Sequence, residues 1–190
     1  MAVLFTSDTH FFHNNVLRFD NRPWNTMEDM CNEMLKRWNS KVSKDDTVYI
    51  LGDYTWKQGD EHIEFLKKLN GHKRLVLGNH DFRNASRKYK DLFEAIKDYD
   101  DIKVTLQNGE VKRCILSHYF MPFYNAHYYG SILLHGHSHN TKEHYEELRI
   151  AKELNDKGFT NQIHNVGCML WNYEPVTLDE ILTGGEKDKN

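Results

Sequence analysis

The sequence predicts an α/β fold in which an antiparallel sheet is added to a parallel one. In the first half of the chain, short apolar segments alternate with stretches of helical periodicity, an order typical of parallel sheets. In the second half, Asn108-Gly109 separates two apolar-rich segments, which is the strongest short-range signal for a hairpin. In addition, five apolar segments each lead into Asp, Asn or His, so the predicted strands share one polar edge.

The first half of the chain contains three predicted strands with a helix between each pair. Thr26 is the expected N-cap of the first helix, with Asp29 three residues later, and the apolar residues of this helix form one stripe. Asp60 is the expected N-cap of the second helix, which ends at Asn70-Gly71, a sequence that fits a left-handed cap. The predicted elements are strands at 2–5, 47–51 and 75–77 and helices at 27–38 and 61–69.

The second half of the chain has shorter elements around the predicted hairpin. One apolar segment leads into Gly136-His137-Ser138-His139, and the charged stretch that follows predicts a surface helix rather than a binding site. We interpret residues 1–183 as a single domain and residues 184–190 as a flexible C-terminal tail. The predicted elements are helices at 88–96, 142–157 and 178–182 and strands at 102–106, 111–116, 132–134 and 163–166.

Composition limits the classes of function. The 190 residues are 39% hydrophobic, which is enough for a substantial core in one domain. A net charge of −3 without a basic block argues against binding nucleic acid through surface charge, although a nucleotide can still be the substrate. The three cysteines are widely spaced, which indicates neither a disulfide framework nor a Cys-x-x-Cys zinc site. With no leader and no membrane-length apolar run, we expect a cytoplasmic protein without membrane contact, and its oligomeric state is left open.

The polar residues at the predicted strand ends are candidate metal ligands. Two carboxylates, one amide oxygen and four imidazoles exceed the three or four protein ligands of one catalytic ion, so they indicate two divalent ions. Mixed oxygen and imidazole ligation favours manganese, with iron, nickel and zinc as alternatives, over calcium or magnesium. Each motif alone is common, and the prediction depends on their joint occurrence. The candidate ligands are Asp8, His10, Asp53, Asn79, His118, His137 and His139.

Taken together, these motifs resemble those of the calcineurin-like metallophosphoesterase superfamily, and of its small single-domain phosphodiesterases in particular. The matching motifs are Asp8-x-His10, Gly52-Asp53, Gly78-Asn79-His80-Asp81, His118 and Gly136-His137-x-His139. The resemblance implies a four-layer αββα sandwich, in which helices flank two mixed sheets. For one ion it implies the ligands Asp8, His10 and His139. For the other ion it implies Asn79, His118 and His137, with Asp53 as the bridging ligand.

The resemblance also implies a mechanism, in which a hydroxide that bridges the two ions attacks phosphorus in line. His80 follows a ligand but is not one in the family pattern, so it is the candidate general acid for the leaving oxygen, with a supporting role as the alternative. In the loop after His10, His13 is a candidate donor to a phosphoryl oxygen, and Arg22 is in the same loop. Aromatic residues that could stack on a base, although such residues are usually core, are Phe11, Phe12, Tyr54 and Trp56.

Departures from the family pattern bear on the substrate. The serine/threonine phosphatases of this superfamily read Gly-Asp-x-Val-Asp-Arg-Gly at the second motif, whereas residues 52–58 read Gly-Asp-Tyr-Thr-Trp-Lys-Gln and lack the phosphate-binding arginine. The variant Gly-Asn-His-Asp is common among small phosphodiesterases. We therefore favour hydrolysis of a phosphodiester or small phosphoester, with a phosphomonoesterase or protein phosphatase as the alternative. A metal-binding scaffold without catalysis is less favoured because every ligand position is kept, and a nuclease is less favoured because a basic cleft is lacking.

Overall fold

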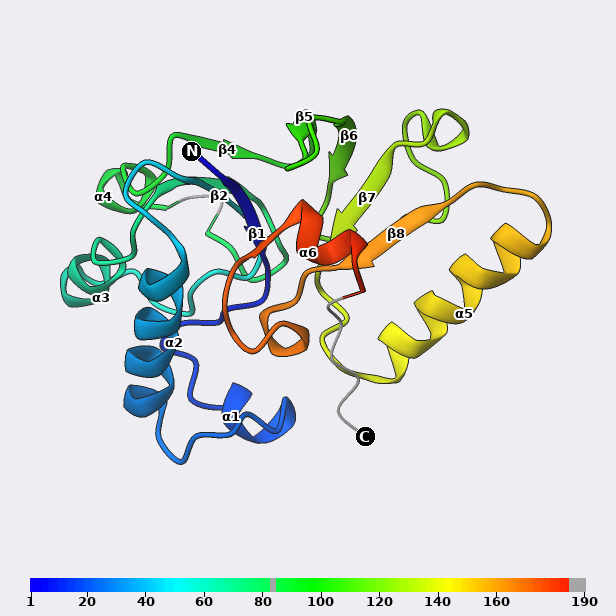
Figure 1. Cartoon of the computed structure of the whole chain (residues 1–190). Helices are drawn as coiled ribbons and strands as arrows, with labels where there is room; N and C mark the ends of the chain where they lie inside the picture. Colours follow the sequence, from blue (N-terminus) through cyan, green and yellow to red (C-terminus); the bar gives the residue numbers. More distant parts are fainter. Residues whose placement is uncertain (83–84, 185–190) are drawn as a thin grey trace.

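Two β-sheets form the centre of the protein, which the computed structural model describes over residues 1–82 and 85–184 (Figure 1). The first sheet has the strand order β4-β3-β2-β1-β9, in which β9 is antiparallel to β1 and the other neighbours are parallel. The predicted parallel arrangement of the first half is therefore confirmed. The strands are β1 (Val3–Thr6), β2 (Thr47–Leu51), β3 (His72–Val76), β4 (Ala95–Lys97) and β9 (Val176–Thr177).

The second sheet has the strand order β5-β6-β7-β8, in which β5 is antiparallel to β6 and the other neighbours are parallel. The turn at Asn108-Gly109 joins β5 to β6 as predicted, and Gly109 adopts a φ of +86° there. Both sheets are mixed, as the resemblance implied. The strands are β5 (Asp100–Thr105), β6 (Val111–Leu116), β7 (Ile132–His135) and β8 (Gln162–Asn165).

Helices flank both sheets, with α2, α3 and α4 on one side of the molecule and α5 on the other (Figure 1). The side chain of Thr26 accepts a hydrogen bond from the Asp29 amide at 3.0 Å, which confirms the predicted cap of α2. The α-helices are α1 (Val16–Phe19), α2 (Met27–Lys41), α3 (Asp60–Leu66), α4 (Arg87–Lys90), α5 (Lys142–Asp156) and α6 (Leu178–Leu182). Two short 3-10 helices are His127–Tyr129 and Cys168–Leu170. No helix among the described residues is long and apolar enough to cross a membrane.

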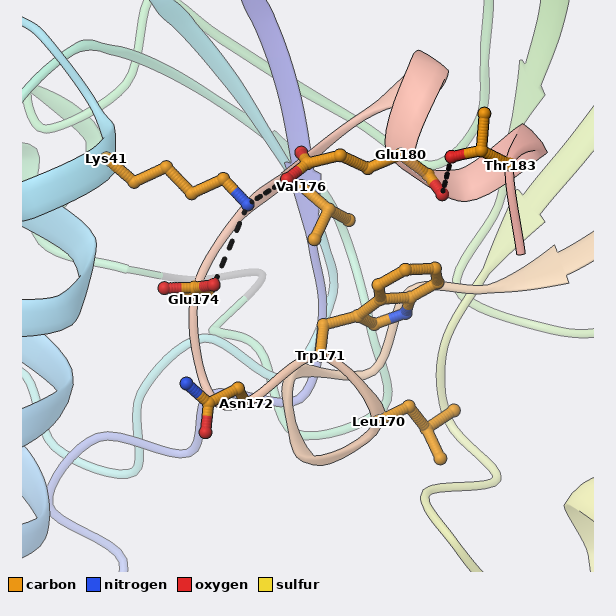
Figure 2. A pocket seen from close by; sticks show the side chains of 8 residues that line it. All are labelled: Lys41, Leu170, Trp171, Asn172, Glu174, Val176, Glu180 and Thr183. Carbon is orange, nitrogen blue, oxygen red and sulfur yellow. Dashed lines mark hydrogen bonds and ion pairs between the residues drawn. The ribbon is translucent and has the colours of Figure 1, made fainter. Parts of the chain in front are cut away.

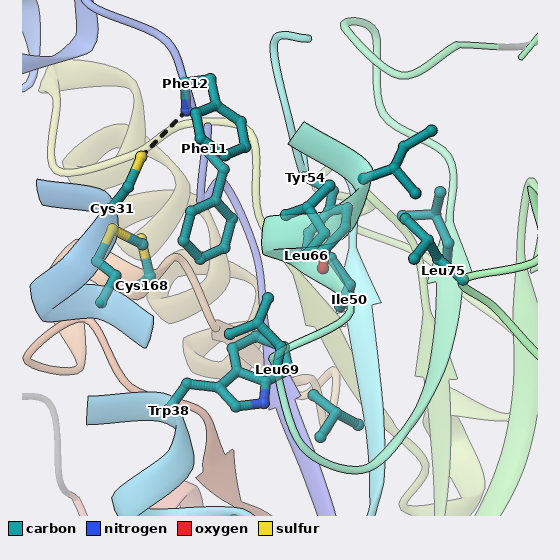
Figure 3. Close-up of a cluster of buried hydrophobic side chains, with 14 of the residues drawn as sticks. Phe11, Phe12, Cys31, Trp38, Ile50, Tyr54, Leu66, Leu69, Leu75 and Cys168 are labelled. Carbon is teal, nitrogen blue, oxygen red and sulfur yellow. Dashed lines mark hydrogen bonds between the residues drawn. The ribbon is translucent and has the colours of Figure 1, made fainter. Parts of the chain in front are cut away.

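The apolar core is divided by the first sheet. One cluster lies between this sheet and the helices α2 and α3, and it includes Trp38 of α2, Leu66 of α3 and the sheet residue Ile50 (Figure 3). A second cluster lies between the two sheets and includes Phe5 of β1 and Leu134 of β7. Because apolar side chains from both sheets meet in this second cluster, the two sheets are held face to face, and the loops that follow β1 and β7 lie close together.

The segment after α4 differs from the prediction. A helix is predicted at 88–96, but α4 is a single turn and β4 pairs in parallel with β3, with Ala95 opposite Arg74. Pairing with β3 satisfies the backbone hydrogen bonds of this segment, and such tertiary contacts outweigh weak local helix propensity. The helix prediction is therefore wrong beyond the first turn.

Other boundaries differ for local reasons. The N-cap of α3 is Gly59, without a side-chain hydrogen bond, and Asp60 is instead the first helical residue. The helix ends at Leu66, so Gly71, with a φ of +88°, belongs to the turn into β3 rather than to the helix end. The short elements α1 and β9 are not predicted, because so few residues show no periodicity. Of the predicted tail, residues 185–190 lie outside the described residues.

Candidate metal centre

The candidate ligands lie in the loops that follow strands of both sheets. In the first sheet, Asp8 and His10 follow β1, Asp53 follows β2, and Asn79 and His80 follow β3. In the second sheet, His118 follows β6, and His137 and His139 follow β7. Carboxyl ends of parallel strands share one edge, and here the edges of the two sheets adjoin, so residues distant in the sequence come together.

The first ligand group consists of Asp8, His10 and His139, each of which offers an atom within 4.8 Å of the others. His139 Nε2 lies 3.3 Å from His10 Nε2 and 3.6 Å from the nearest Asp8 oxygen. Two ligands of one tetrahedral ion, each bound at about 2.1 Å, are separated by about 3.4 Å. The donor atoms of the first group are thus spaced as a divalent cation requires.

The second ligand group consists of Asp53, Asn79 and His118. His118 Nε2 lies 3.0 Å from Asn79 Oδ1 and 3.7 Å from Asp53 Oδ1. The other oxygen of Asp53, Oδ2, lies 3.6 Å from His10 Nε2. Asp53 therefore has one oxygen facing each group. Asp8 also approaches both groups, since its carboxylate, that of Asp53 and the His118 ring lie within 4.8 Å of one another.

His137 lies beside the second group. Its ring centroid is 5.0 Å from that of His118, and its backbone amide donates to both oxygens of Asp8, at 3.0 and 3.2 Å. The structure thus brings all seven predicted ligands to one edge. His137 contributes to this site in two ways: its backbone amide holds the Asp8 carboxylate, and its ring lies next to that of His118.

Five of the candidate ligands adopt a left-handed backbone conformation that is uncommon for residues other than glycine. Their φ angles are +56° for Asp8, +47° for His10, +53° for Asp53, +71° for His137 and +51° for His139. Each such conformation costs on the order of 1–2 kcal/mol and persists only where other contacts enforce it. Here the amides of Asp8 and His10 bond to Gly52 O and Asp53 O, both at 3.0 Å. Such a concentration of strain is typical of a functional site.

A family model described as calcineurin-like phosphoesterase matches residues 1–171. The chain belongs to the calcineurin-like phosphoesterase family. It is 32% identical to the uncharacterized protein MJ1445 of Methanocaldococcus jannaschii, over 98% of this chain and 93% of that protein. It is 33% identical to the Gene 66 protein of Mycobacterium phage D29, over 94% of this chain and 93% of the phage protein.

A solved structure shares the fold with this calcineurin-like phosphoesterase. The crystal structure of AQ665, a protein of unknown function from Aquifex aeolicus, superposes with a TM-score of 0.69. The two are 26% identical, and the match covers 95% of this chain and 97% of the other. Members of the family generally bind divalent metals, in agreement with the two ligand groups.

In this calcineurin-like phosphoesterase, the pKa shifts of two candidate ligands, Asp8 and His10, also agree with binding of a cation. Burial raises the pKa of the Asp8 carboxyl, because a lone carboxylate is poorly solvated there. Burial, with the nearby Arg22 charge, holds the pKa of His10 well below its usual range, so that the ring stays neutral. A neutral imidazole is the form that binds a metal ion, and a bound cation would favour the ionised carboxylate.

Asp81 supports the second group through the backbone. Its carboxylate accepts hydrogen bonds from the amides of Gly78 and Asp53, both at 2.8 Å, and of Tyr54 at 3.1 Å. His118 Nδ1 lies 2.7 Å from Leu51 O, which leaves Nε2 facing Asn79 and Asp53. The role of Asp81 is missed by the sequence analysis, although the residue stands within the Gly-Asn-His-Asp motif.

The loop after His10 contains both confirmed and corrected predictions. Phe11 and Tyr54 are fully buried and Phe12 nearly so, so these three rings cannot stack on a base. Trp56 is 41% exposed, and its ring stacks on that of His13 with a centroid distance of 3.9 Å. His13 itself is buried, and burial lowers its pKa.

Of two further candidates in the chain, Arg22 differs from expectation, and the role of His80 stays a prediction. Arg22, which the sequence analysis places in a substrate loop, is only 4% exposed and lies beneath the first ligand group. His80, the candidate acid, is exposed; its ring lies 5.0 Å from Trp56 and 5.8 Å from His10 between centroids.

A separate cavity lies between α2 and the C-terminal segment, away from the ligand groups (Figure 2). Lys41 enters it and pairs with Glu180 at 2.7 Å and Glu174 at 3.8 Å. Both carboxylates are thus engaged by the one ammonium group, and none of the candidate ligands lines the cavity. We therefore assign the chemistry to the shared edge of the sheets.

Proposed function

We propose that this protein is a phosphoesterase that holds two divalent cations and hydrolyses a phosphodiester or small phosphoester. Membership of the calcineurin-like phosphoesterase family supports the reaction class. The observation that carries the dinuclear form is the placement of Asp53, whose two oxygens face His10 and His118 at 3.6 and 3.7 Å. A carboxylate shared in this way is what two neighbouring cations require.

The proposed division of the ligands between the two cations follows the resemblance to the family. Asp8, His10 and His139 would hold one cation, Asn79, His118 and His137 the other, and Asp53 would be shared. Manganese suits this mixture of oxygen and nitrogen donors best, with iron, nickel or zinc as alternatives. When bound, the two cations supply acidification of water and neutralisation of charge on the phosphoryl oxygens.

The protein's own residues complete the reaction. The exposed ring of His80 lies 5.8 Å from that of His10 between centroids and would donate a ring N–H proton to the leaving oxygen. The amide of His80 donates to Asp53 Oδ1 at 2.9 Å, which holds this histidine next to the shared carboxylate. His13, whose ring face stacks on Trp56 and whose Nδ1 is buried without a hydrogen-bond partner, would act as a donor to a phosphoryl oxygen.

The structure favours a diester over a phosphoprotein among possible substrates. Arg22, the buried arginine near the first group, already bonds to Asp20 and to two backbone carbonyls, so it is not free to bind a phosphoryl group. A monoester dianion has more charge to neutralise than a diester anion. Among the described residues that follow β2, no arginine takes the place of the phosphate-binding one in the protein phosphatases.

The proposal is tested with metal-stripped protein reloaded with Mn²⁺ or Ni²⁺. We expect two bound cations per chain and faster hydrolysis of bis(4-nitrophenyl) phosphate than of 4-nitrophenyl phosphate or a phosphopeptide. Asp53→Asn should bind fewer cations and lose activity by about 100- to 1,000-fold. The matched control is Asp45→Asn, an exposed aspartate away from the groups. Equal turnover of diester and phosphopeptide would contradict the diester preference, and a protein that takes up no cation would contradict the function itself.

A further inference from the structure

We infer that Asp20 and Arg22 form a buried pair that positions His139 and so sets the affinity of the first ligand group for its cation. Both are positioning residues, since they act through His139 and Asp8. The inference rests on the proposed function only in requiring that the first group binds a divalent cation.

The first step is the contact between Asp20 and His139. Asp20 Oδ1 lies 3.1 Å from His139 Nδ1 in an ion-pair contact that is close but not aligned as a hydrogen bond, and the two side chains are 2% and 11% exposed. A carboxylate on Nδ1 selects the tautomer in which Nε2 carries the lone pair. Nε2 is the nitrogen that faces Asp8 and His10. Asp20 therefore turns the correct nitrogen of His139 toward the cation.

The second step is the fixation of Asp20 by Arg22. Arg22 Nε donates to Asp20 Oδ2 at 2.8 Å, while Oδ1 is left for His139. The Arg22 side chain is fully buried and that of Asp20 is 2% exposed. A buried carboxylate with both oxygens engaged has little freedom to rotate, so its direction is transmitted to the His139 ring.

The third step links the same arginine to Asp8. Arg22 Nη2 donates to Asp8 O at 2.7 Å, and Nη1 donates to Thr9 O at 2.8 Å. These carbonyls belong to the strained turn in which Asp8 has a φ of +56°. One guanidinium thus fixes the backbone of one ligand and, through Asp20, the ring of another. Lysine cannot reproduce this planar set of donors.

The second ligand group does not use this pair. His118 Nδ1 faces the backbone carbonyl of Leu51, and Asp53 is supported by Asp81. Loss of the pair should therefore weaken the binding of the cation of the first group and leave the binding of the other cation unchanged. A general structural defect would weaken both.

The experiment compares Mn²⁺ titrations of wild-type protein, Asp20→Asn and Arg22→Lys by calorimetry, with bound metal counted after dialysis. We expect one of the two binding events to weaken about 10- to 100-fold in each variant and the other to stay within about twofold. Activity of Asp20→Asn should be lost at low Mn²⁺ and recover at high Mn²⁺. The matched control is Arg18→Lys, an exposed arginine of α1, which should bind both cations normally.

The outcomes separate the two proposals. Wild-type affinity at both sites in Asp20→Asn, or equal weakening of both sites, overturns the positioning role while leaving the proposed function intact. A wild-type chain that binds no cation overturns the proposed function. If Arg22→Lys does not fold, as thermal unfolding will show, the isosteric Asp20→Asn decides alone.

A different observation carries a second inference: we propose that Trp56 and Phe19 form a subsite for an aromatic or nucleobase group of the substrate. Phe19 is 58% exposed and Trp56 is 41% exposed. The Phe19 ring lies 6.1 Å from that of His139, a ligand of the first group, and the Trp56 ring lies 5.0 Å from that of His80, the candidate acid, both between centroids. This inference deepens the proposed function by naming the substrate class.

The opposite side of the centre is less suited to a nucleotide. A groove beside His137 is lined by Tyr119, Phe120 and Ile150 and by three carboxylates of α5, those of Glu143, Glu146 and Glu147. Acidic side chains repel an anionic substrate. The exposed aromatic rings near His80 carry no such charge, so the base is placed on that side.

Two diesters with the same leaving group test this subsite: thymidine 5′-(4-nitrophenyl) phosphate and methyl 4-nitrophenyl phosphate. Stacking on one ring is worth about 1–3 kcal/mol, so Trp56→Ala and Phe19→Ala should each lower kcat/KM for the nucleotide about 10-fold. The methyl ester should change less than about twofold. Tyr129→Ala, which removes a ring that is 91% exposed elsewhere, is the control. Equal losses on both diesters overturn the subsite, whereas a wild type inactive on both overturns the proposed function.

Discussion

The two ligand groups are supported in different ways. The first group depends on side chains, because Arg22 and Asp20 hold the Asp8 turn and the His139 ring. The second group depends on the backbone, because His118 faces Leu51 O and Asp81 accepts three amides. The comparison teaches that substitutions of Asp20 or Arg22 should act mainly on the first group, while the second should be sensitive to changes of Asp81 and of backbone conformation.

The largest effect is expected for Gly52→Ala. Gly52 has a φ of +92°, and a Cβ there would collide with the His118 ring. We expect a loss of about 3–5 kcal/mol in the free energy of unfolding and loss of the cation held by the second group. Gly109→Ala is the matched control, since its φ is +86° but its Cβ would meet nothing within 4 Å. It should cost only about 1 kcal/mol. Equal effects in chemical denaturation would show that crowding at His118 is unimportant.

Metal removal should have the next largest effect. A cation at 100 times its dissociation constant stabilises the folded state by about 2.7 kcal/mol. Chelation should therefore lower the Tm of the wild type, and the shift should be smaller in Asp20→Asn, which keeps only the second site at low Mn²⁺. Identical Tm shifts in the two proteins would argue that both groups share the same support.

Asp81→Asn should have an intermediate effect. The amide keeps one oxygen acceptor but cannot accept from all three backbone amides, and an unpaired buried donor costs about 1–3 kcal/mol. We expect a stability loss in that range and weaker binding of the cation of the second group. Denaturant titration and Mn²⁺ calorimetry measure the two effects, and a variant that weakens only the first group would contradict the assignment.

The smallest effect concerns the loop that carries His137 and His139. Ser138 between them donates to Glu147 at 2.6 Å, and burial raises the pKa of Glu147 to about 7. A carboxyl with a raised folded-state pKa contributes stability below its unfolded value of about 4.5 and loses it as pH rises through about 7. After allowance for screening, this amounts to about 1–2 kcal/mol.

Glu147→Gln tests this contribution because glutamine keeps the acceptor for Ser138. The Tm of the metal-free wild type should fall between pH 5 and pH 8 by more than that of the variant. Parallel profiles over this range would mean that Glu147 has no folded-state preference for the proton.

Some of the site could be predicted because its signals are local. The motifs that contain Asp8, Asp53 and His118 stand at the ends of apolar segments, and the ends of neighbouring strands must share an edge. The β5–β6 hairpin was equally predictable, because an Asn-Gly turn depends on two residues only.

Other features depend on contacts between distant segments. Local periodicity predicts a helix over residues 95–96, but these residues form part of β4, which pairs with β3. The same loop composition gives Tyr54 a core position and Trp56 an exposed one, and nothing in residue type distinguishes the two. The sequence does not indicate that Arg22 is buried, because its hydrogen-bond partners Asp20, Asp8 and Thr9 surround it only in the folded protein.

The sequence by itself determined which side chains can ligate a cation, because ligand chemistry belongs to residue type and the apolar runs place those residues at strand ends. Only the tertiary structure decided how these ligands are oriented. Orientation depends on hydrogen bonds across large sequence separations, such as those of Arg22 to the Asp8 turn and of Asp81 to the amide of Asp53. Such bonds form only when the loops after β1, β2 and β3 are brought together in the first sheet, and no local pattern records them.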